Sequence, residues 1–222
     1  MKSQIRCIVL IGLGSIGKRH LESLIKLKHK YKIYLIDKNL ETLEFCKRKV
    51  CKNTNVHNFF FLNKISNLPR FIDLAIIATN ADKRREVVEK LIYRASIKYI
   101  IFEKIAFQSI TDFKKIIYFL NKKGIKSWVN CPRRIFPIYK KLKKEVNGKP
   151  LVMSIEGNNW GMASNSVHFL DLLSYLIEEN KFYLVNSNLD KKIYRSKRKS
   201  FYEFGGKFII KSLYGSIIMF RD

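Results

Sequence analysis

The feature that most constrains this chain is a glycine-rich turn between a short apolar run and a segment of helical period. Residues 8–11 lead directly into Gly12-Leu13-Gly14-Ser15-Ile16-Gly17. This spacing is typical of a strand, turn and helix that bind a dinucleotide. We expect Gly12 to make the tight turn, Gly14 to let a pyrophosphate approach the backbone, and Gly17 to let the helix pack closely on the strand. The N–H groups of Ser15 and Ile16 would then face the phosphates.

A carboxylate stands where the second part of such a motif belongs. Asp37 follows Gly17 by 20 residues and closes the second apolar run, where an acid accepts hydrogen bonds from the adenosine ribose hydroxyls. Its charge would repel the 2′-phosphate of NADP, whereas the neighbouring Lys38 could attract that group. We therefore expect NAD as the cofactor, with NADP as the open alternative. The alternative for the whole motif is a structural turn with Asp37 as a helix cap.

The first 130 residues alternate between β-branched runs and helical periodicity, which predicts an α/β fold with a doubly wound parallel sheet. The six expected strands are 6–11, 32–36, 56–61, 73–78, 99–102 and 126–129. Asp82 and Thr111 are the expected N-caps of two of the intervening helices. We therefore predict an NAD(P)-binding Rossmann domain at residues 1–130.

The pattern changes after Cys131 and predicts a smaller α+β domain at residues 131–222, with a mainly antiparallel sheet. The expected elements are a helix at 139–146, a strand at 151–156, a helix at 166–177 and a hairpin of 207–213 with 216–220. Residues 191–199 carry six basic side chains and are interpreted as a solvated loop rather than a binding patch. The antiparallel strands of this sheet are expected to have exposed apolar faces, which include Phe208, Ile210, Ile217 and Met219, and pairing through the sheet face is expected to form a homo-oligomer.

The formal net charge of +26 suggests an anionic partner, but the composition weakens that reading. The chain has 32 Lys and 12 Arg, together with 29 Ile and 16 Asn, a joint excess typical of A/T-rich codon usage. We therefore do not expect nucleic acid as the main partner, because groove-reading proteins rely on arginine. No apolar stretch approaches the roughly 18 residues of a membrane span. The four cysteines lack metal-ligand or disulfide spacing, which favours a cytoplasmic location and no metal site.

Five short motifs together resemble one known family. His20 comes three residues after Gly17, Ala78-Thr79-Asn80 follows the fourth expected strand, and Glu103-Lys104 ends the fifth. Further along, Arg133-Arg134-Ile135-Phe136-Pro137 opens the second domain, and His168 precedes Asp171 by three residues. These motifs are similar to those of the Gfo/Idh/MocA oxidoreductases, and the resemblance covers nearly the whole chain.

The resemblance implies a role for each of these motifs. Thr79, Asn80 and Glu103 would lie near the cofactor, Lys104 would reach the substrate and the cofactor ribose, and His168 would be the second catalytic residue. Two positions depart from the family pattern: Ile105 replaces a proline that pins the loop of Lys104, and Ser164 stands where an aspartate is common. The chain also stops soon after one hairpin, which suggests a compact variant or a C-terminally short chain.

Position alone supports part of this assignment. Thr79, Asn80, Glu103, Lys104 and Asn130 all follow expected parallel strands, and ligands bind beyond the carboxyl ends of such strands. A lysine placed there can serve as a general base; the alternative is one more surface lysine. For His168 the alternative is a core histidine. The remaining histidines, His20, His29 and His57, are assigned no role.

The second domain supplies candidate substrate contacts. Arg133 and Arg134 could hold a phosphate or carboxylate in bidentate fashion, and Asp171 could orient His168 on one helix face. In the polar segment 157–165, Trp160 could stack on a sugar ring, while Asn159 and Asn165 bond hydroxyls; the alternative is an ordinary turn.

We therefore predict an NAD(P)-dependent oxidoreductase that acts on a carbinol carbon of a sugar or sugar nucleotide. The alternative is a non-catalytic dinucleotide-binding regulatory or scaffold protein.

Overall fold

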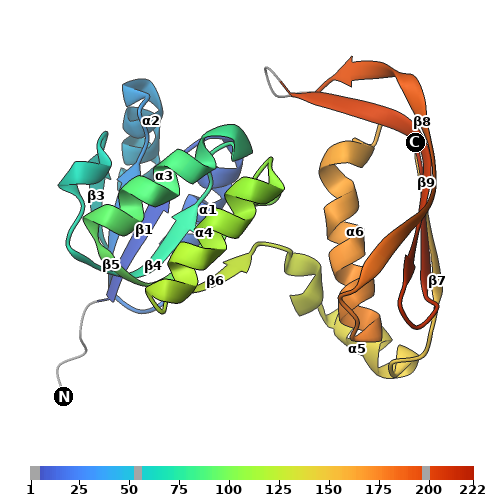
Figure 1. Ribbon diagram of the computed structural model, residues 1–222. Helices are drawn as coiled ribbons and strands as arrows, with labels where there is room; N and C mark the ends of the chain where they lie inside the picture. Colours follow the sequence, from blue (N-terminus) through green and yellow to red (C-terminus); the bar gives the residue numbers. More distant parts are fainter. Residues whose placement is uncertain (1–5, 53–56, 197–200) are drawn as a thin grey trace. The chain divides into compact units, whose positions relative to one another are not determined.

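The computed structural model describes residues 6–52, 57–196 and 201–222. The chain divides into two compact units, Met1–Asn130 and Cys131–Asp222 (Figure 1). Each has its own sheet and its own hydrophobic core, so each is described by itself. No helix in the described ranges is both long and apolar enough to cross a membrane.

The first unit is built on six parallel strands in the order β3-β2-β1-β4-β5-β6. Their bounds are β1 Arg6–Ile11, β2 Tyr31–Ile36, β3 Asn58–Leu62, β4 Phe71–Ile77, β5 Ser96–Phe102 and β6 Lys126–Val129. This is the doubly wound order of a Rossmann fold, so the predicted fold class is confirmed. Val56, expected in the third strand, lies outside the described residues. The order reverses between β1 and β4, which opens a crevice beyond their carboxyl ends.

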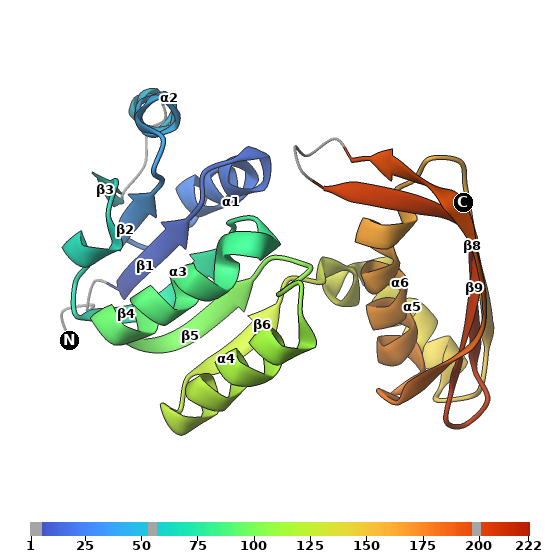
Figure 2. The same ribbon diagram turned by 45° about the horizontal axis from the view of Figure 1, so that its top comes forward.

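Four helices cover the two faces of this sheet. Figure 2 shows α1 (Ser15–Ile25) and α2 (Leu40–Cys51) on one side, and α3 (Ala81–Arg94) and α4 (Ile110–Lys122) on the other. Because successive strand residues point to opposite faces, neighbours on one strand enter different cores. Leu10 is buried with the first helix pair, and Val9 with the second. A short 3-10 helix, η1 (Ile65–Asn67), precedes β4.

Two predicted helix caps are wrong. Asp82 lies in the first turn of α3, which begins after Asn80, and Thr111 lies inside α4, which begins after Ser109. The Ser109 hydroxyl accepts a hydrogen bond of 3.0 Å from the N–H of Asp112. A cap must reach the backbone two or three residues ahead, and Ser109 satisfies this condition two residues earlier than Thr111.

The second unit packs two helices on one face of a four-stranded sheet (Figure 1). After the 3-10 helix η2 (Pro132–Ile135), its elements are α5 Pro137–Val146, β7 Val152–Glu156, α6 Met162–Ile177, β8 Phe182–Arg195, β9 Tyr202–Ser212 and β10 Ile217–Arg221. The order is β7-β10-β9-β8, with only the β7–β10 pair parallel. The predicted α+β organisation is therefore confirmed. The core forms where Leu173 and Leu176 of α6 meet Ile218 and Phe220 of β10.

The prediction that residues 191–199 form a solvated loop is wrong for the first part of this segment. Residues up to Arg195 belong to β8, where Ile193 pairs with Phe204 and Tyr194 with Glu203. Lys191 and Lys192 lie in an irregularity of the pairing between Leu189 and Ile193, and their side chains are exposed. Residues 197–199 lie outside the described residues.

The prediction that the hairpin exposes these four apolar residues is wrong for Phe208 and Ile210. Phe208 pairs with Phe220 across β9 and β10, and both belong to the core under α6, as does Ile210. Ile217 and Met219 alternate with the buried residues of β10 and therefore lie on the opposite face. The four predicted residues are divided between two faces because the register sets their parity.

Candidate functional site

Two glycines shape the turn between β1 and α1. Gly12 has φ of 91°, and a Cβ there would lie 2.7 Å from the Thr79 nitrogen. A Cβ on Gly17 would lie 1.9 Å from the Gly12 carbonyl oxygen. These distances exclude side chains at both positions, so the first strand, the helix and the Ala78-Thr79 turn can approach only through glycine.

A pocket of about 900 Å³ opens at the carboxyl ends of β1, β2 and β4. It is lined by five predicted cofactor residues, which are Gly12, Gly14, Asp37, Thr79 and Asn80. Apart from Gly14 itself and its two chain neighbours, no described residue has a heavy atom within 4 Å of the place that a Cβ on Gly14 would take. A ligand can therefore approach the Gly14 backbone directly.

Asp37 joins the floor of this pocket to the glycine turn. Its Oδ2 accepts a hydrogen bond of 2.7 Å from the Leu13 N–H, and its Oδ1 accepts one of 2.9 Å from the Asn39 N–H. The carboxylate is half-buried and lines the pocket. It thus holds the loop between β1 and α1 while facing the space where a ribose would lie.

The residues present fit a dinucleotide. No described side chain caps the amino end of α1, so the first N–H groups of this helix are open to an anion. Among the described residues, the buried Thr79 Oγ1 has no hydrogen-bond partner, as expected of a group that awaits a ligand. Basic lining residues outnumber acidic ones, and they are Lys38, Lys64, Lys83, Lys90 and Arg94, against Asp37 and Glu86.

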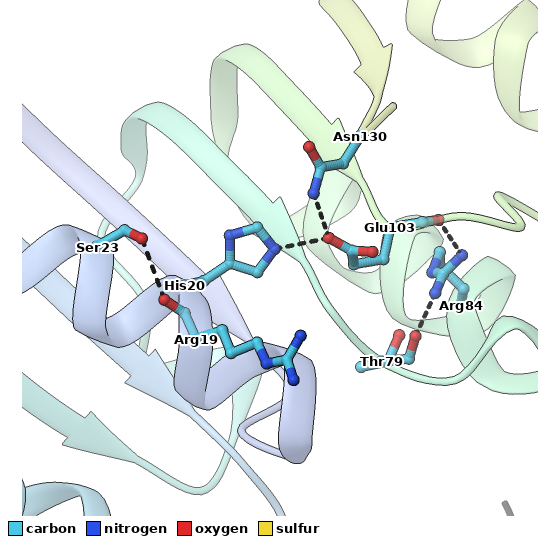
Figure 3. Close-up of polar contacts among 7 residues, drawn as sticks. All are labelled: Arg19, His20, Ser23, Thr79, Arg84, Glu103 and Asn130. Carbon is cyan, nitrogen blue, oxygen red and sulfur yellow. Dashed lines mark hydrogen bonds and ion pairs between the residues drawn. The ribbon is translucent and has the colours of Figure 1, made fainter. Parts of the chain in front are cut away.

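A buried carboxylate lies next to this pocket at the end of β5. Glu103 is 6% exposed, and its Oε1 lies 2.7 Å from His20 Nε2 and 2.6 Å from Asn130 Nδ2 (Figure 3). Burial alone would raise the pKa of Glu103, but the hydrogen bonds from His20 and Asn130, together with the electrostatic effects of His20 and Arg84, hold the pKa below its usual value. Glu103 therefore ties α1 and the end of β6 to β5.

The assignment of no role to His20 is wrong, because this histidine converges with Asn130 on Glu103. The available signal was its place three residues after Gly17, in the first turns of a helix that begins at the ligand-binding edge.

Arg84 is the residue that sequence reasoning missed most completely. It is 2% exposed, and its guanidinium donates to the carbonyl oxygens of Glu103 at 2.6 Å and Ala106 at 2.9 Å. It also donates to the carbonyls of Ile105 and Thr79. The charged run 82–86 looks exposed in the sequence, yet the helical spacing of Arg84 with Val88 and Leu91 places it on the buried face of α3.

Lys104 lies half-buried at the carboxyl end of β5, inside the turn that Arg84 contacts. The peptide bond from Lys104 to Ile105 is cis. The expectation that this turn loses its pin when isoleucine replaces proline is incomplete, because Arg84 binds the carbonyls on both sides of Lys104.

In the second unit, His168 lies half-buried on α6, one turn after Ser164. The Ser164 N–H donates to Glu203 Oε2 at 3.2 Å. Glu203 comes from β9, so the fold brings an acid to the amino end of α6, beside the position where the sequence lacks one. No sequence spacing could indicate this pair, because 39 residues separate its members.

The two arginines predicted to bind the substrate, Arg133 and Arg134, already have partners. Arg134 forms a two-bond ion pair with Asp171, at 2.8 Å from Nε and 2.6 Å from a terminal nitrogen. The hydrogen bond with Asp171 raises the pKa of Arg134. The Arg133 guanidinium lies 4.1 Å from the ring centroid of Phe169. Arg134 and Asp171 therefore tie η2 to α6.

Two side chains of the predicted sugar-binding segment, Trp160 and Asn165, already have partners in the second unit. The Trp160 ring stacks on Phe220 with centroids 6.2 Å apart, and its Nε1 donates to the Arg221 carbonyl at 3.0 Å. Asn165 Nδ2 donates to the Trp160 carbonyl at 2.8 Å.

The described part of the chain holds no group of three or more His, Cys, Asp or Glu side chains that could bind a metal ion.

Comparisons with known proteins agree with this geometry. The model of GFO_IDH_MocA, an oxidoreductase family with an NAD-binding Rossmann fold, matches residues 6–131. No curated protein sequence matches the chain significantly.

Similar solved structures include myo-inositol dehydrogenase from Lactobacillus casei in complex with NAD(H) and myo-inositol. Its TM-score is 0.73 at 18% identity, and the match covers 98% of this chain and 67% of that one. A super-repressor mutant of Gal80p from Saccharomyces cerevisiae also has a TM-score of 0.73, at 15% identity, with 98% and 68% covered. Apo scyllo-inositol dehydrogenase from L. casei gives 0.70 at 17%, with 99% and 69% covered. At these identities the likeness shows the fold alone.

Proposed function

The chain belongs to the Gfo/Idh/MocA family of NAD-binding oxidoreductases, and on this premise we propose that it is an NAD-dependent dehydrogenase of a sugar or sugar nucleotide. The observation that carries the proposal is the pocket of about 900 Å³ in which Gly14, Asp37 and Thr79 meet. Asp37 favours NAD, because its carboxylate would repel a 2′-phosphate. Lys38, on the same pocket wall, keeps NADP as the alternative cofactor.

The proposed reaction oxidises a secondary alcohol. A bound nicotinamide supplies the hydride acceptor, and the protein must take up the hydroxyl proton. Lys104 lies at the carboxyl end of β5, where ligands of such sheets bind, so we assign it the contact with the reacting hydroxyl. His168 is assigned as the acceptor of the hydroxyl proton, since histidine is the side chain that most often serves as a general acid or base. Arg84 and Glu103 hold the turn that carries Lys104.

Two observations support the proposed substrate class: the polar segment before α6 and the ligand named for one similar structure. Trp160 and Asn165 are assigned to the substrate side, with Asp171 and Arg134 bracing α6. Arg133 is assigned to an anionic group of the substrate. One similar structure holds myo-inositol, a polyhydroxylated ligand. This supports only the proposed class of substrate and not a preference for inositol.

We also propose a homo-oligomer and a cytoplasmic location. Ile209, Ile217 and Met219 lie on the sheet face opposite α6 and are only half-buried, and pairing of two such faces would cover them. All four cysteines are free thiols, which suits a reducing compartment.

The test is a screen of NADH production, followed at 340 nm, against inositols, sugars and nucleotide sugars. We expect one class to react with NAD. The matched control is Lys104→Met in the same screen. If wild type binds NADH but oxidises none of the panel, the dehydrogenase assignment fails and the second candidate takes its place.

The second candidate is a dinucleotide-binding regulator without catalysis. It is favoured by one observation, namely that transcriptional regulators, the Gal80p proteins, are among the similar structures. In that case NADH binding would persist without NADH production in the screen. Neither Lys104→Met nor His168→Ala would then change a measured property of the protein.

A further inference from the structure

Arg84 carries an inference that rests on the proposed function and extends it to a residue outside the predicted site. We propose that Arg84 is a positioning residue, which locks the turn of residues 103–106, and with it Lys104, to the Thr79 turn of the cofactor pocket. It touches neither cofactor nor substrate in this assignment. It acts through the backbone of two segments that do.

The burial of Arg84 is the first support. A guanidinium withdrawn from water is strongly destabilising unless its donors are satisfied. Here at 2% exposure it donates to four carbonyl oxygens, those of Thr79, Glu103, Ile105 and Ala106. Val88, Leu91 and Ile92, farther along α3, are buried against the same sheet, so the helix that carries Arg84 is rigidly held.

The distribution of these bonds is the second support. One terminal nitrogen binds the three carbonyls of the Glu103–Ala106 turn, and the other binds Thr79 at the end of β4. Figure 3 shows Arg84 between the two segments, on the backbone side of Glu103. The bonded carbonyls of Glu103 and Ile105 flank Lys104. Its backbone is therefore fixed on both sides by one planar group.

The planar fork explains why arginine is needed. A guanidinium offers five N–H donors in a fixed geometry, whereas an ammonium offers three around a single point. Lysine at this position would keep the charge but could not span both turns. Misplacement of a reacting group by about 1 Å can lower the rate by about 10²-fold. Weakening the hydrogen bonds of Arg84 should therefore affect turnover more than NADH binding.

The experiment compares Arg84→Lys with the matched control Arg85→Lys. Arg85 is the next residue of α3, and it pairs with Asp112 and Glu89 at the surface. Three properties are measured on the full chain: hydrogen exchange of the amides at 78–81 and 103–107, NADH affinity by fluorescence, and kcat with the substrate from the screen. Melting temperature reports folding.

For Arg84→Lys we expect faster exchange in both turns, a kcat lower by about 10²-fold, and an NADH dissociation constant within about threefold of wild type. Arg85→Lys should match wild type in all three. Wild-type exchange rates in Arg84→Lys would overturn the proposal, as would an unchanged kcat. A merely structural role is recognised by kcat, NADH affinity and melting temperature falling together, and this outcome also overturns it.

A second variant covers the case in which Arg84→Lys does not fold. The Gln side chain of Arg84→Gln is neutral and keeps two N–H donors. The same three measurements apply, and we expect the same changes in exchange rate, kcat and NADH affinity. The exchange measurement needs no cofactor. If wild type binds no NADH and has no activity, the proposed function fails. Unaltered exchange in either variant would separately show that Arg84 does not hold the two turns together.

Discussion

At the scale of single residues, Asp37 links the proposed preference for NAD over NADP to the geometry of the loop between β1 and α1. Its two oxygens accept hydrogen bonds from the Leu13 and Asn39 backbone, so the carboxylate is held in place before any ligand arrives. A preorganised charge of this kind discriminates against a 2′-phosphate without further movement. Lys38 is the nearest opposing influence in sequence, and it lines the same pocket.

Replacing Asp37 should therefore change cofactor preference. We expect Asp37→Ala to bind NAD more weakly and to improve the ratio of NADP to NAD affinity by at least about tenfold, which is 1.4 kcal/mol. Asp37→Asn, which keeps an oxygen for the Leu13 N–H, separates loss of charge from loss of the loop contact. Calorimetric titration with both cofactors measures the ratio. A wild type that prefers NADP by tenfold or more would contradict the assignment to NAD.

Lys104 and His168 should affect turnover and leave cofactor affinity nearly unchanged. We expect Lys104→Met and His168→Ala each to lower kcat by about 10² to 10⁴, the usual contribution of a positioned acid or base. Suitable controls are Lys98→Met, at an exposed position earlier on β5, and His29→Ala at the surface. The pH–rate profiles of wild type and variants provide the measurement. Full activity in both variants would place the chemistry elsewhere.

At the scale of elements, the sequence predicts strands better than contacts between them. The runs 6–11 and 126–129 match β1 and β6 in both bounds, because buried parallel strands appear as uninterrupted apolar or β-branched runs. Arg84 and Glu203 could not be found in this way. Their partners come from other elements, and only tertiary packing decides which charged residues of a helix or strand turn inward.

The Glu103 contact between α1, β5 and β6 should make stability depend on pH. The pKa of Glu103 is lower in the folded chain than its usual value of 4.5, so the unfolded chain binds this proton at higher pH. The carboxylate therefore stabilises the fold above that value, and the stabilisation is lost as pH falls through the folded pKa. We expect the difference in melting temperature between wild type and Glu103→Gln to be present at pH 7 and to vanish in strong acid. A difference independent of pH would show that the charge is unimportant.

At the scale of the whole molecule, two features involve many residues at once. The first is the net charge of +26, to which lysine contributes most of the basic side chains. The excess of basic over acidic residues also appears in the lining of the cofactor pocket. The second feature is the sheet of the second unit. One of its faces packs against α5 and α6, while the other carries half-buried apolar residues.

That second face should mediate self-association. We expect light scattering at tens of micromolar protein to show a homo-oligomer, and Met219→Lys to shift it toward the monomer, because a charge would have to be buried between the two faces. Lys211→Arg, on the same face, is the conservative control. A monodisperse wild-type monomer at that concentration would refute the proposed association.

The central claim is that the turn after β1 binds a nicotinamide dinucleotide, and calorimetric titration of NADH into wild type and Gly14→Val tests it most directly. A valine side chain at Gly14 would occupy open space in the pocket without meeting described protein atoms near its Cβ. The variant should therefore keep the circular dichroism spectrum and melting temperature of wild type. We predict saturable NADH binding by wild type and none by Gly14→Val. Equal affinity in the two proteins, or no binding by correctly folded wild type, would contradict the account.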